Sequence, residues 1–142
     1  MNIKSVQYGG WEDRMKPEEF MNFLNEEKKN SLERAAKLTA DDRKDDANQC
    51  KIEANIYDIF MTLYQMAWQQ AGADEVKADA MFREKARVIP DSWRESLERA
   101  IEHGDTAKIL AGQTKMSVVE RVMKEYDKPD KKKIWKKEKG VK

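Results

Sequence analysis

The segment from Lys51 to Gln69 constrains the fold of this chain more than any other. Six of its polar residues recur at steps of four, three, four, three and four, and they are Lys51, Asn55, Asp58, Thr62, Gln65 and Gln69. Residues three and four positions apart are neighbours on one face of an α-helix, so this spacing predicts a helix with a narrow polar stripe. Most other residues from 52 to 68 are apolar. A helix that is apolar around most of its circumference must be covered by other elements or by a partner chain.

The apolar part of this helix divides into two sides. One side holds Ile52, Ile56, Ile59, Phe60, Leu63, Met66 and Ala67, and the second is a ridge of Tyr57, Met61, Tyr64 and Trp68. Aromatic residues at helical spacing usually pack in a core, which is one interpretation of the ridge. Alternatively, the ridge is a groove for a partner helix or an apolar ligand, or a dimer interface, because only 25 of the 142 residues are Leu, Ile, Val or Phe.

Helix start signals place the first two helices. Pro17 suits the first turn of a helix, and the acidic residues that follow it favour the positive end of the helix dipole. We expect this helix to run to Leu38. Thr39 followed three residues later by Asp42 resembles a capping box, which predicts that the long second helix begins near Ala40. Residues 39–46 are then either the exposed first turns of this helix or a tight corner before it.

Glycine and proline mark the remaining boundaries. Gly72 is expected to end the second helix in a left-handed cap, and Pro90 to end a third helix over residues 74–87. A fourth helix, capped by Asp91 or Ser92, then runs to His103 and Gly104, and Asp105 caps a last helix over residues 106–126. Gly112 leaves two alternatives for this last helix, either continuous or broken at that glycine. The sequence therefore predicts an all-α, single-domain bundle of about five helices around a long central helix, with a body over residues 1–127 and a basic tail over residues 128–142.

The charges are distributed unevenly along the chain. Residues 128–142 contain eight lysines against Asp130 and Glu138, a net charge of +6. Residues 1–127 contain 20 basic and 25 acidic residues, a net charge of −5. The chain, whose formal net charge is +1, is thus an acidic body followed by a basic tail.

The basic tail contains two apolar residues among its lysines. The candidate contact residues are Lys131, Lys132, Lys133, Ile134, Trp135, Lys136 and Lys137. A block of like charge is most often a solvated segment, but such a segment has no need of a tryptophan. In one interpretation Ile134 and Trp135 dock on the acidic body, in the same chain or in a second copy. In another, the lysines contact nucleic-acid phosphates while Trp135 stacks on an unpaired base, and in a third the tail adsorbs to anionic lipid.

Residues 92–126 also offer a helix-turn-helix interpretation, with residues 116–126 as the helix presented to the major groove of DNA. That helix carries Arg121 and Lys124, but also Glu120 and Glu125, which repel phosphate. Plain bundle helices are the competing interpretation and the favoured one.

Residue types that usually carry catalysis are sparse. The single histidine, His103, is expected at a helix end, where the dipole favours a cation. Glu98 and Glu102 do not form with it the Glu-x-x-His spacing of di-iron sites. Cys50 is expected to be a buried structural thiol, and Asp58 to be exposed or paired with a lysine. We therefore expect no catalytic residue, no metal site and no cofactor.

The chain contains no run of about 18 apolar residues, so the sequence predicts no membrane-spanning helix. Its first ten residues lack the pattern of a secretory signal, and a single cysteine forms no intramolecular disulfide, which together predict a cytoplasmic protein. We expect a non-catalytic helical module that self-associates or binds another protein, with the tail as a docking arm. The alternative is a nucleic-acid-associated protein that uses the tail lysines and Trp135.

Overall fold

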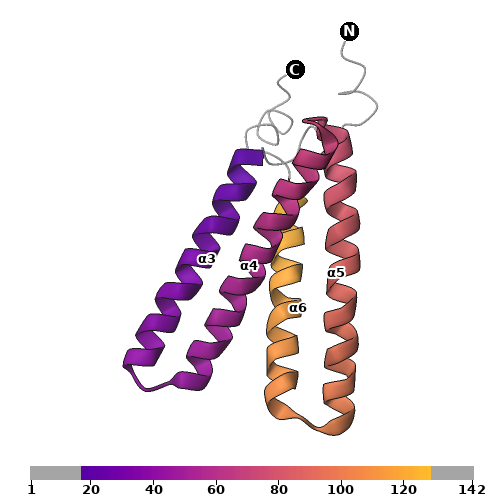
Figure 1. Cartoon of the computed structure of the whole chain (residues 1–142). Coiled ribbons are helices and arrows are strands. Elements are labelled where there is room, and N and C mark those ends of the chain that lie inside the picture. Colours follow the sequence, from indigo (N-terminus) through magenta and orange to yellow (C-terminus); the bar gives the residue numbers. More distant parts are fainter. Residues whose placement is uncertain (1–16, 129–142) are drawn as a thin grey trace, which may run out of the picture.

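The computed structural model describes residues 17–128, and this part of the chain is all-α. It contains four helices, which are α3 (Pro17–Ala40), α4 (Lys44–Ala71), α5 (Glu75–His103) and α6 (Thr106–Tyr126). Successive helices run in opposite directions, so the starts of α3 and α5 lie at the same end of the molecule as the end of α6 (Figure 1). The all-α bundle predicted from the sequence is confirmed, whereas the expected number of about five helices is not.

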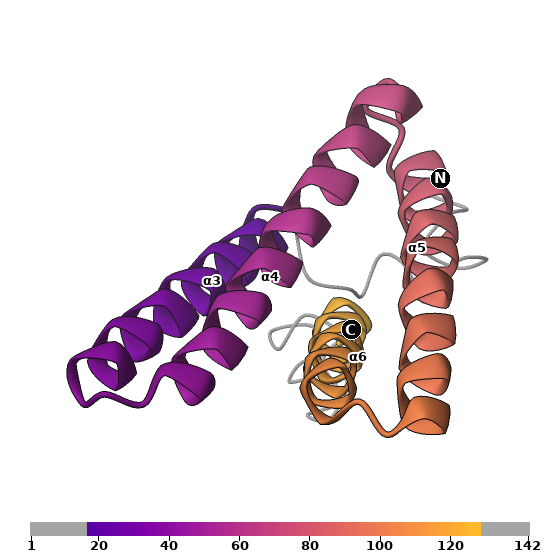
Figure 2. The same cartoon turned by 60° about the horizontal axis from the view of Figure 1, so that its bottom comes forward.

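The four helices form two hairpins. One hairpin is α3 with α4 and the other is α5 with α6, and the two lie at an angle to each other, with their turns far apart (Figure 2). Helix α4 packs against α3, α5 and α6. However, α5 is one residue longer than α4, and much of α4 is covered by α3 on one side only. A bundle built around one long central helix is therefore not confirmed.

The prediction that Pro90 ends a helix is wrong, because α5 continues through it from Glu75 to His103. Proline lacks the N–H that would bond the carbonyl of Ala86, so the helix loses one backbone hydrogen bond at this point. The ring of Pro90 is fully buried, and Ala86 and Ala100, one on each side of it, are buried as well. Proline at this position predicts two helices. Tertiary packing on both sides of Pro90 instead keeps α5 as one continuous helix.

The predicted start of the second helix near Ala40 is also wrong, since α4 begins at Lys44. The hydroxyl of Thr39 does not cap α4, because it donates a hydrogen bond to the Ala35 carbonyl, at 2.8 Å, in the last turn of α3. Asp42 adopts a φ of 58°, in the left-handed region, where the chain reverses direction. The N-cap of α4 is Arg43, whose side chain makes no capping hydrogen bond.

The two glycine caps and the Asp105 cap behave as predicted, whereas the break at Gly112 does not occur. Gly72 and Gly104 end α4 and α5 in the left-handed conformation, with φ of 61° and 65°. The side chain of Asp105 caps α6 by accepting a hydrogen bond from the Lys108 backbone N–H. Gly112 does not break α6, which is continuous through it.

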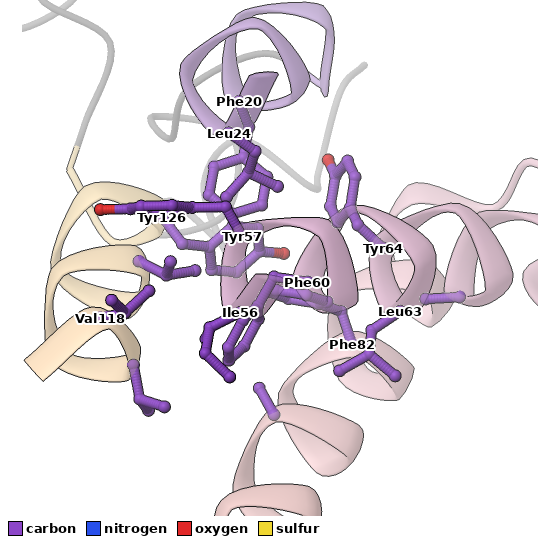
Figure 3. Close-up of a cluster of buried hydrophobic side chains, with 14 residues drawn as sticks. Phe20, Leu24, Ile56, Tyr57, Phe60, Leu63, Tyr64, Phe82, Val118 and Tyr126 are labelled. Carbon is purple, nitrogen blue, oxygen red and sulfur yellow. The ribbon is translucent and has the colours of Figure 1, made fainter. Parts of the chain in front are cut away.

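The core is a cluster of aromatic rings at the end of the molecule where the hairpins meet (Figure 3). Rings from all four helices take part, and they belong to Phe20, Phe23, Tyr57, Phe60, Tyr64, Trp68, Phe82 and Tyr126. The ring centroids of Phe20 and Tyr126 are 4.9 Å apart, with the rings edge to face. Such pairs each contribute about 0.5–1.5 kcal/mol beyond the area they bury. These contacts fix the ends of α3 and α6 beside each other.

The far part of the α3–α4 hairpin is held by small side chains. Ser31 and Ala35 of α3 and Ala47, Cys50 and Ala54 of α4 are all buried. Small residues allow two helices to approach closely but bury little apolar area. The expectation that Cys50 is a buried thiol is confirmed.

Candidate functional site

The ridge predicted on α4 packs largely within the chain. Tyr57 and Tyr64 are buried, with 0% and 5% of their surface exposed, and their rings contact Phe23 and Phe20 of α3. Met61 and Trp68 are half-buried and pack against the same aromatic cluster. The ridge therefore supplies core contacts between α3 and α4, and its two half-buried members present only part of their surface to solvent.

The polar stripe of α4 lies at the surface as predicted. All six of its residues, Lys51, Asn55, Asp58, Thr62, Gln65 and Gln69, are exposed. The Asp58 carboxylate forms an ion pair with Lys28 of α3, with an Nζ–Oδ1 distance of 2.9 Å. The expectation that Asp58 is exposed or paired with a lysine is confirmed.

A polar network lies at the end of α6, immediately before the basic tail. The Tyr126 hydroxyl donates a hydrogen bond to Asp79 Oδ1 at 2.5 Å, and Arg83 contacts the same carboxylate at 3.1 Å. The Arg83 guanidinium also donates to Asp127 at 2.5 Å and lies 5.0 Å from the centre of the Tyr126 ring. Lys128 forms a separate ion pair with Glu125 of α6 at 3.0 Å, whereas Asp127 is the residue bound to Arg83 of α5. The start of the tail is therefore fixed to α5.

The network changes the acidity of Tyr126. Burial of the ring, the hydrogen bond to Asp79 and the charge of that carboxylate raise the pKa of Tyr126 well above its ordinary value. Burial likewise raises the pKa of Tyr57, although Arg121 opposes this by donating a hydrogen bond to the Tyr57 hydroxyl at 2.8 Å. Both phenols therefore stay neutral in the folded protein at neutral pH, where Tyr126 acts as a hydrogen-bond donor.

Unpaired carboxylates lie at the turn between α3 and α4. Asp41, Asp42 and Asp45 are exposed, and none of them forms an ion pair among residues 17–128. Asp46 differs, because it pairs with Arg43 at 2.6 Å. Arg43 and Lys44 stand between these carboxylates, so residues 41–45 carry a net charge of −1. This acidic turn, residues 41–45, lies at the end of the α3–α4 hairpin opposite the start of the tail (Figure 1).

The remaining sequence-based candidates fall into three groups. The tail residues Lys131, Lys132, Lys133, Ile134, Trp135, Lys136 and Lys137 lie outside the described residues. A three-helix helix-turn-helix over residues 92–126 is wrong, because this segment is the end of α5 followed by one continuous helix, α6. Val118, Val122 and Tyr126, on the helix proposed for the major groove, are buried in the core.

His103 lies in the last turn of α5 as predicted. Between residues 17 and 128, no three His, Cys, Asp or Glu side chains are grouped so that they could hold a metal ion. None of the four described helices is long and apolar enough to cross a membrane.

Comparison with models of known protein families, with curated proteins and with solved structures finds no match to this chain. The chemistry of its surfaces is therefore inferred from its own residues.

Two features escaped the sequence analysis. The network of Asp79, Arg83 and Tyr126 joins residues 47 positions apart, so no local pattern indicates it. The second feature is a groove between α5 and α6, lined by Trp93 and Lys115 among others. Its only local signal is the glycine at position 112, which the sequence suggests as a helix break.

Proposed function

We propose that this protein is a self-associating interaction module, in which the basic tail of one copy binds the acidic turn of another. The observation that carries the proposal is the separation of charge, with a net −5 over residues 1–127 and a net +6 over residues 128–142. Opposite charges of this size attract two copies and orient them as they meet.

The geometry of the body supports a contact between copies. Helix α3 has 24 residues, so the acidic turn lies about 36 Å along the molecule from the start of the tail. A tail of 15 residues spans at most about 50 Å when fully extended. Binding to its own acidic turn would hold the tail near full extension, at a cost in conformational entropy. A second copy in the opposite orientation brings its acidic turn to the tail without that cost, and the contact is then made twice by symmetry.

Charge alone does not stabilise such a contact strongly. Exposed ion pairs between lysine and carboxylate contribute about 0.2–1 kcal/mol each and are screened by salt. Ile134 and Trp135 supply apolar area in the middle of the tail, and burying side chains of this size contributes about 1.5–3 kcal/mol each. The tail therefore needs both its lysines and its two apolar residues to hold a second copy.

The test is the mass of the protein in solution, measured by light scattering over a range of concentrations. The full-length chain is expected to approach twice its monomer mass of 16.6 kDa as concentration rises. A chain ending at Lys128, and a full-length chain with Ile134→Ser and Trp135→Ser, are expected to stay monomeric. A full-length chain that is monomeric throughout, or a truncated chain that dimerises equally well, would contradict the proposal.

A matched pair of variants locates the surface that the tail binds. Neutralising the turn with Asp41→Asn and Asp45→Asn, which removes two charges as the control does, is expected to weaken dimerisation about tenfold through loss of ion pairs. Neutralising Glu18→Gln and Glu19→Gln, exposed acids at the other end of α3, is expected to change it less than twofold. If the Glu18 and Glu19 substitutions weakened dimerisation more than the substitutions in the turn, the binding surface would lie beside the start of the tail.

The second candidate function is binding to nucleic acid through the same tail. It is favoured by the combination of seven lysines with Trp135 after residue 128, which suits phosphate contacts together with stacking on an unpaired base. A labelled single-stranded oligonucleotide separates the two functions. If the tail binds phosphates, affinity falls with salt along a log-log slope of about −0.7 for each phosphate contacted, and deletion of residues 129–142 abolishes binding.

A further inference from the structure

A groove of about 440 Å³ runs between α5 and α6, and no residue of the acidic turn lines it. Its lining includes Trp93, Leu97 and Arg99 of α5 and Lys108, Gly112 and Lys115 of α6. Ligand sites in proteins generally enclose about 300–1,000 Å³, so this groove has the volume of a small-molecule site.

The floor of the groove is apolar and is shaped by a glycine. A Cβ atom at position 112 would lie 2.9 Å from Leu97 Cδ1 and 3.0 Å from Leu97 Cβ, closer than side chains normally approach. Glycine therefore lets α6 pass directly over Leu97. Trp93, four residues before Leu97, forms a half-buried aromatic wall beside this crossing.

The rim of the groove is positively charged although the body as a whole is acidic. Arg99, Lys108 and Lys115 line it, whereas Asp105 is its one carboxylate among the described residues. Asp105 is occupied, because it caps α6 and lies 3.9 Å from Lys108 Nζ. The net charge of the groove therefore favours an anion.

Arg99 differs from the arginines before it on α5. Arg83, Arg87 and Arg94 each pair with a carboxylate. The guanidinium of Arg99 contacts only the Ser96 hydroxyl, at 3.4 Å, within the part of the chain that the structure describes. Its planar set of donors is therefore available for a carboxylate, sulfonate or phosphate group.

Lys115 lies on the opposite side of the groove. Its ammonium group is 5.9 Å from the centre of the Trp93 ring, and it has no carboxylate partner among residues 17–128. The same groove thus presents an aromatic wall and two unpaired cations, one from each helix.

We propose that the α5–α6 groove binds a small anion joined to an aromatic ring. The ring stacks on Trp93 over Leu97 and Gly112, while the carboxylate, sulfonate or phosphate group contacts Arg99 and Lys115. This site uses no residue of the tail or the acidic turn, so it is independent of self-association.

The test is a titration of the full-length protein followed by NMR, with naphthalene-1-sulfonate and 1-naphthyl phosphate as probes. Binding is expected with a dissociation constant below about 1 mM, with shifts of the Gly112 and Leu97 amides and the Trp93 indole N–H. Naphthalene-methanol, which has the ring without the charge, and sulfate, which has the charge without the ring, are expected to bind at least about tenfold more weakly. Absence of shifts in the groove with both anionic probes would overturn the proposal.

Two pairs of substitutions separate the site from general charge attraction. Arg99→Gln with Lys115→Gln is expected to weaken binding of naphthalene-1-sulfonate at least about tenfold, because both anion contacts are lost. Arg94→Gln with Lys124→Gln removes the same charge from exposed positions on the same helices that do not line the groove. This control is expected to change binding less than twofold, and equal weakening by the two pairs would refute a specific site.

Discussion

Tyr126 of α6 and Arg83 of α5 connect the aromatic core of this fold to a network of charged side chains. Tyr126 is 7% exposed, contacts Phe20 and Phe82 with its ring and donates a hydrogen bond from its hydroxyl to Asp79. Arg83 then joins Asp79 to Asp127. One tyrosine therefore connects the aromatic core to the charged network at the start of the tail.

Tyr126→Phe tests this network at neutral pH. The ring contacts remain, but the hydrogen bond to an ionised carboxylate is lost, which costs about 1.5–3 kcal/mol. The free energy of unfolding in urea is expected to fall by this amount, with little change in helix content. A loss below about 0.5 kcal/mol would mean that the bond to Asp79 contributes little to stability.

The same residue predicts how stability depends on alkaline pH. The pKa of Tyr126 is raised on folding, so its contribution to stability is complete below pH about 10, the ordinary value for tyrosine, and is lost as pH rises beyond it. Each such group steepens the fall by up to about 1.4 kcal/mol per pH unit. Urea unfolding between pH 9 and pH 11, a range set by the ordinary tyrosine value, is expected to show a shallower fall for Tyr126→Phe than for the native chain. Parallel curves of unfolding free energy against pH for the two chains would contradict this role of Tyr126.

Gly112 is the second residue whose contacts decide the local structure. Alanine is favoured over glycine by about 1 kcal/mol inside a helix, so Gly112→Ala would stabilise an isolated helix. Against Leu97 the added methyl is too close, and overpacking of this kind costs about 1–3 kcal/mol. We expect net destabilisation in urea unfolding, whereas the exposed neighbour Gln113→Ala serves as the control and is expected to be neutral or slightly stabilising. A more stable Gly112→Ala variant would show that α5 and α6 separate readily.

At the scale of elements, the two ends of the α3–α4 hairpin are held by different means. Aromatic rings fill the end near the chain termini, and the other end has a seam of small residues that includes Ser31, Ala35, Ala47 and Cys50. The seam depends on close approach of the helices and has little capacity for a larger side chain.

Ala35→Leu and Ala36→Leu form a matched test of the seam. Ala35 is buried against α4, whereas Ala36, the next residue on the same helix, is exposed. Overpacking predicts that Ala35→Leu lowers the free energy of unfolding by about 1–3 kcal/mol. Ala36→Leu is expected to change it by less than about 0.5 kcal/mol. Similar effects of both substitutions would show that α3 and α4 are not closely packed here.

The sequence predicted these elements well where the structure depends on residues that are close together in the chain. The stripe of exposed residues on α4 and the glycine caps at Gly72 and Gly104 follow from local rules. Pro90 and Thr39 did not follow them, because burial of residues on both sides of Pro90 and a hydrogen bond within α3 outweighed the local signals. The groove was missed for a related reason, since it exists only where α5 and α6 cross.

At the scale of the whole molecule, the chain combines a folded acidic body with a basic segment that starts from a fixed point. The aromatic contacts between Phe20 and Tyr126 place the start of α3 and the end of α6 side by side. The acidic turn lies at the opposite end of the hairpin (Figure 1). In the proposed dimer, two copies in opposite orientations would bring each tail to the other's acidic turn.

The most direct test of this arrangement uses a mixture of two forms of the full-length chain. One form is ¹⁵N-labelled, and the other is unlabelled and carries a nitroxide spin label at Lys142→Cys, with Cys50→Ala to leave one reactive thiol. Self-association through the tail predicts selective broadening of the Asp41, Asp42 and Asp45 amide signals of the labelled form. If those signals stay sharp in the mixture and broaden only when the label and ¹⁵N are in the same chain, the tail binds its own body and self-association through it is wrong.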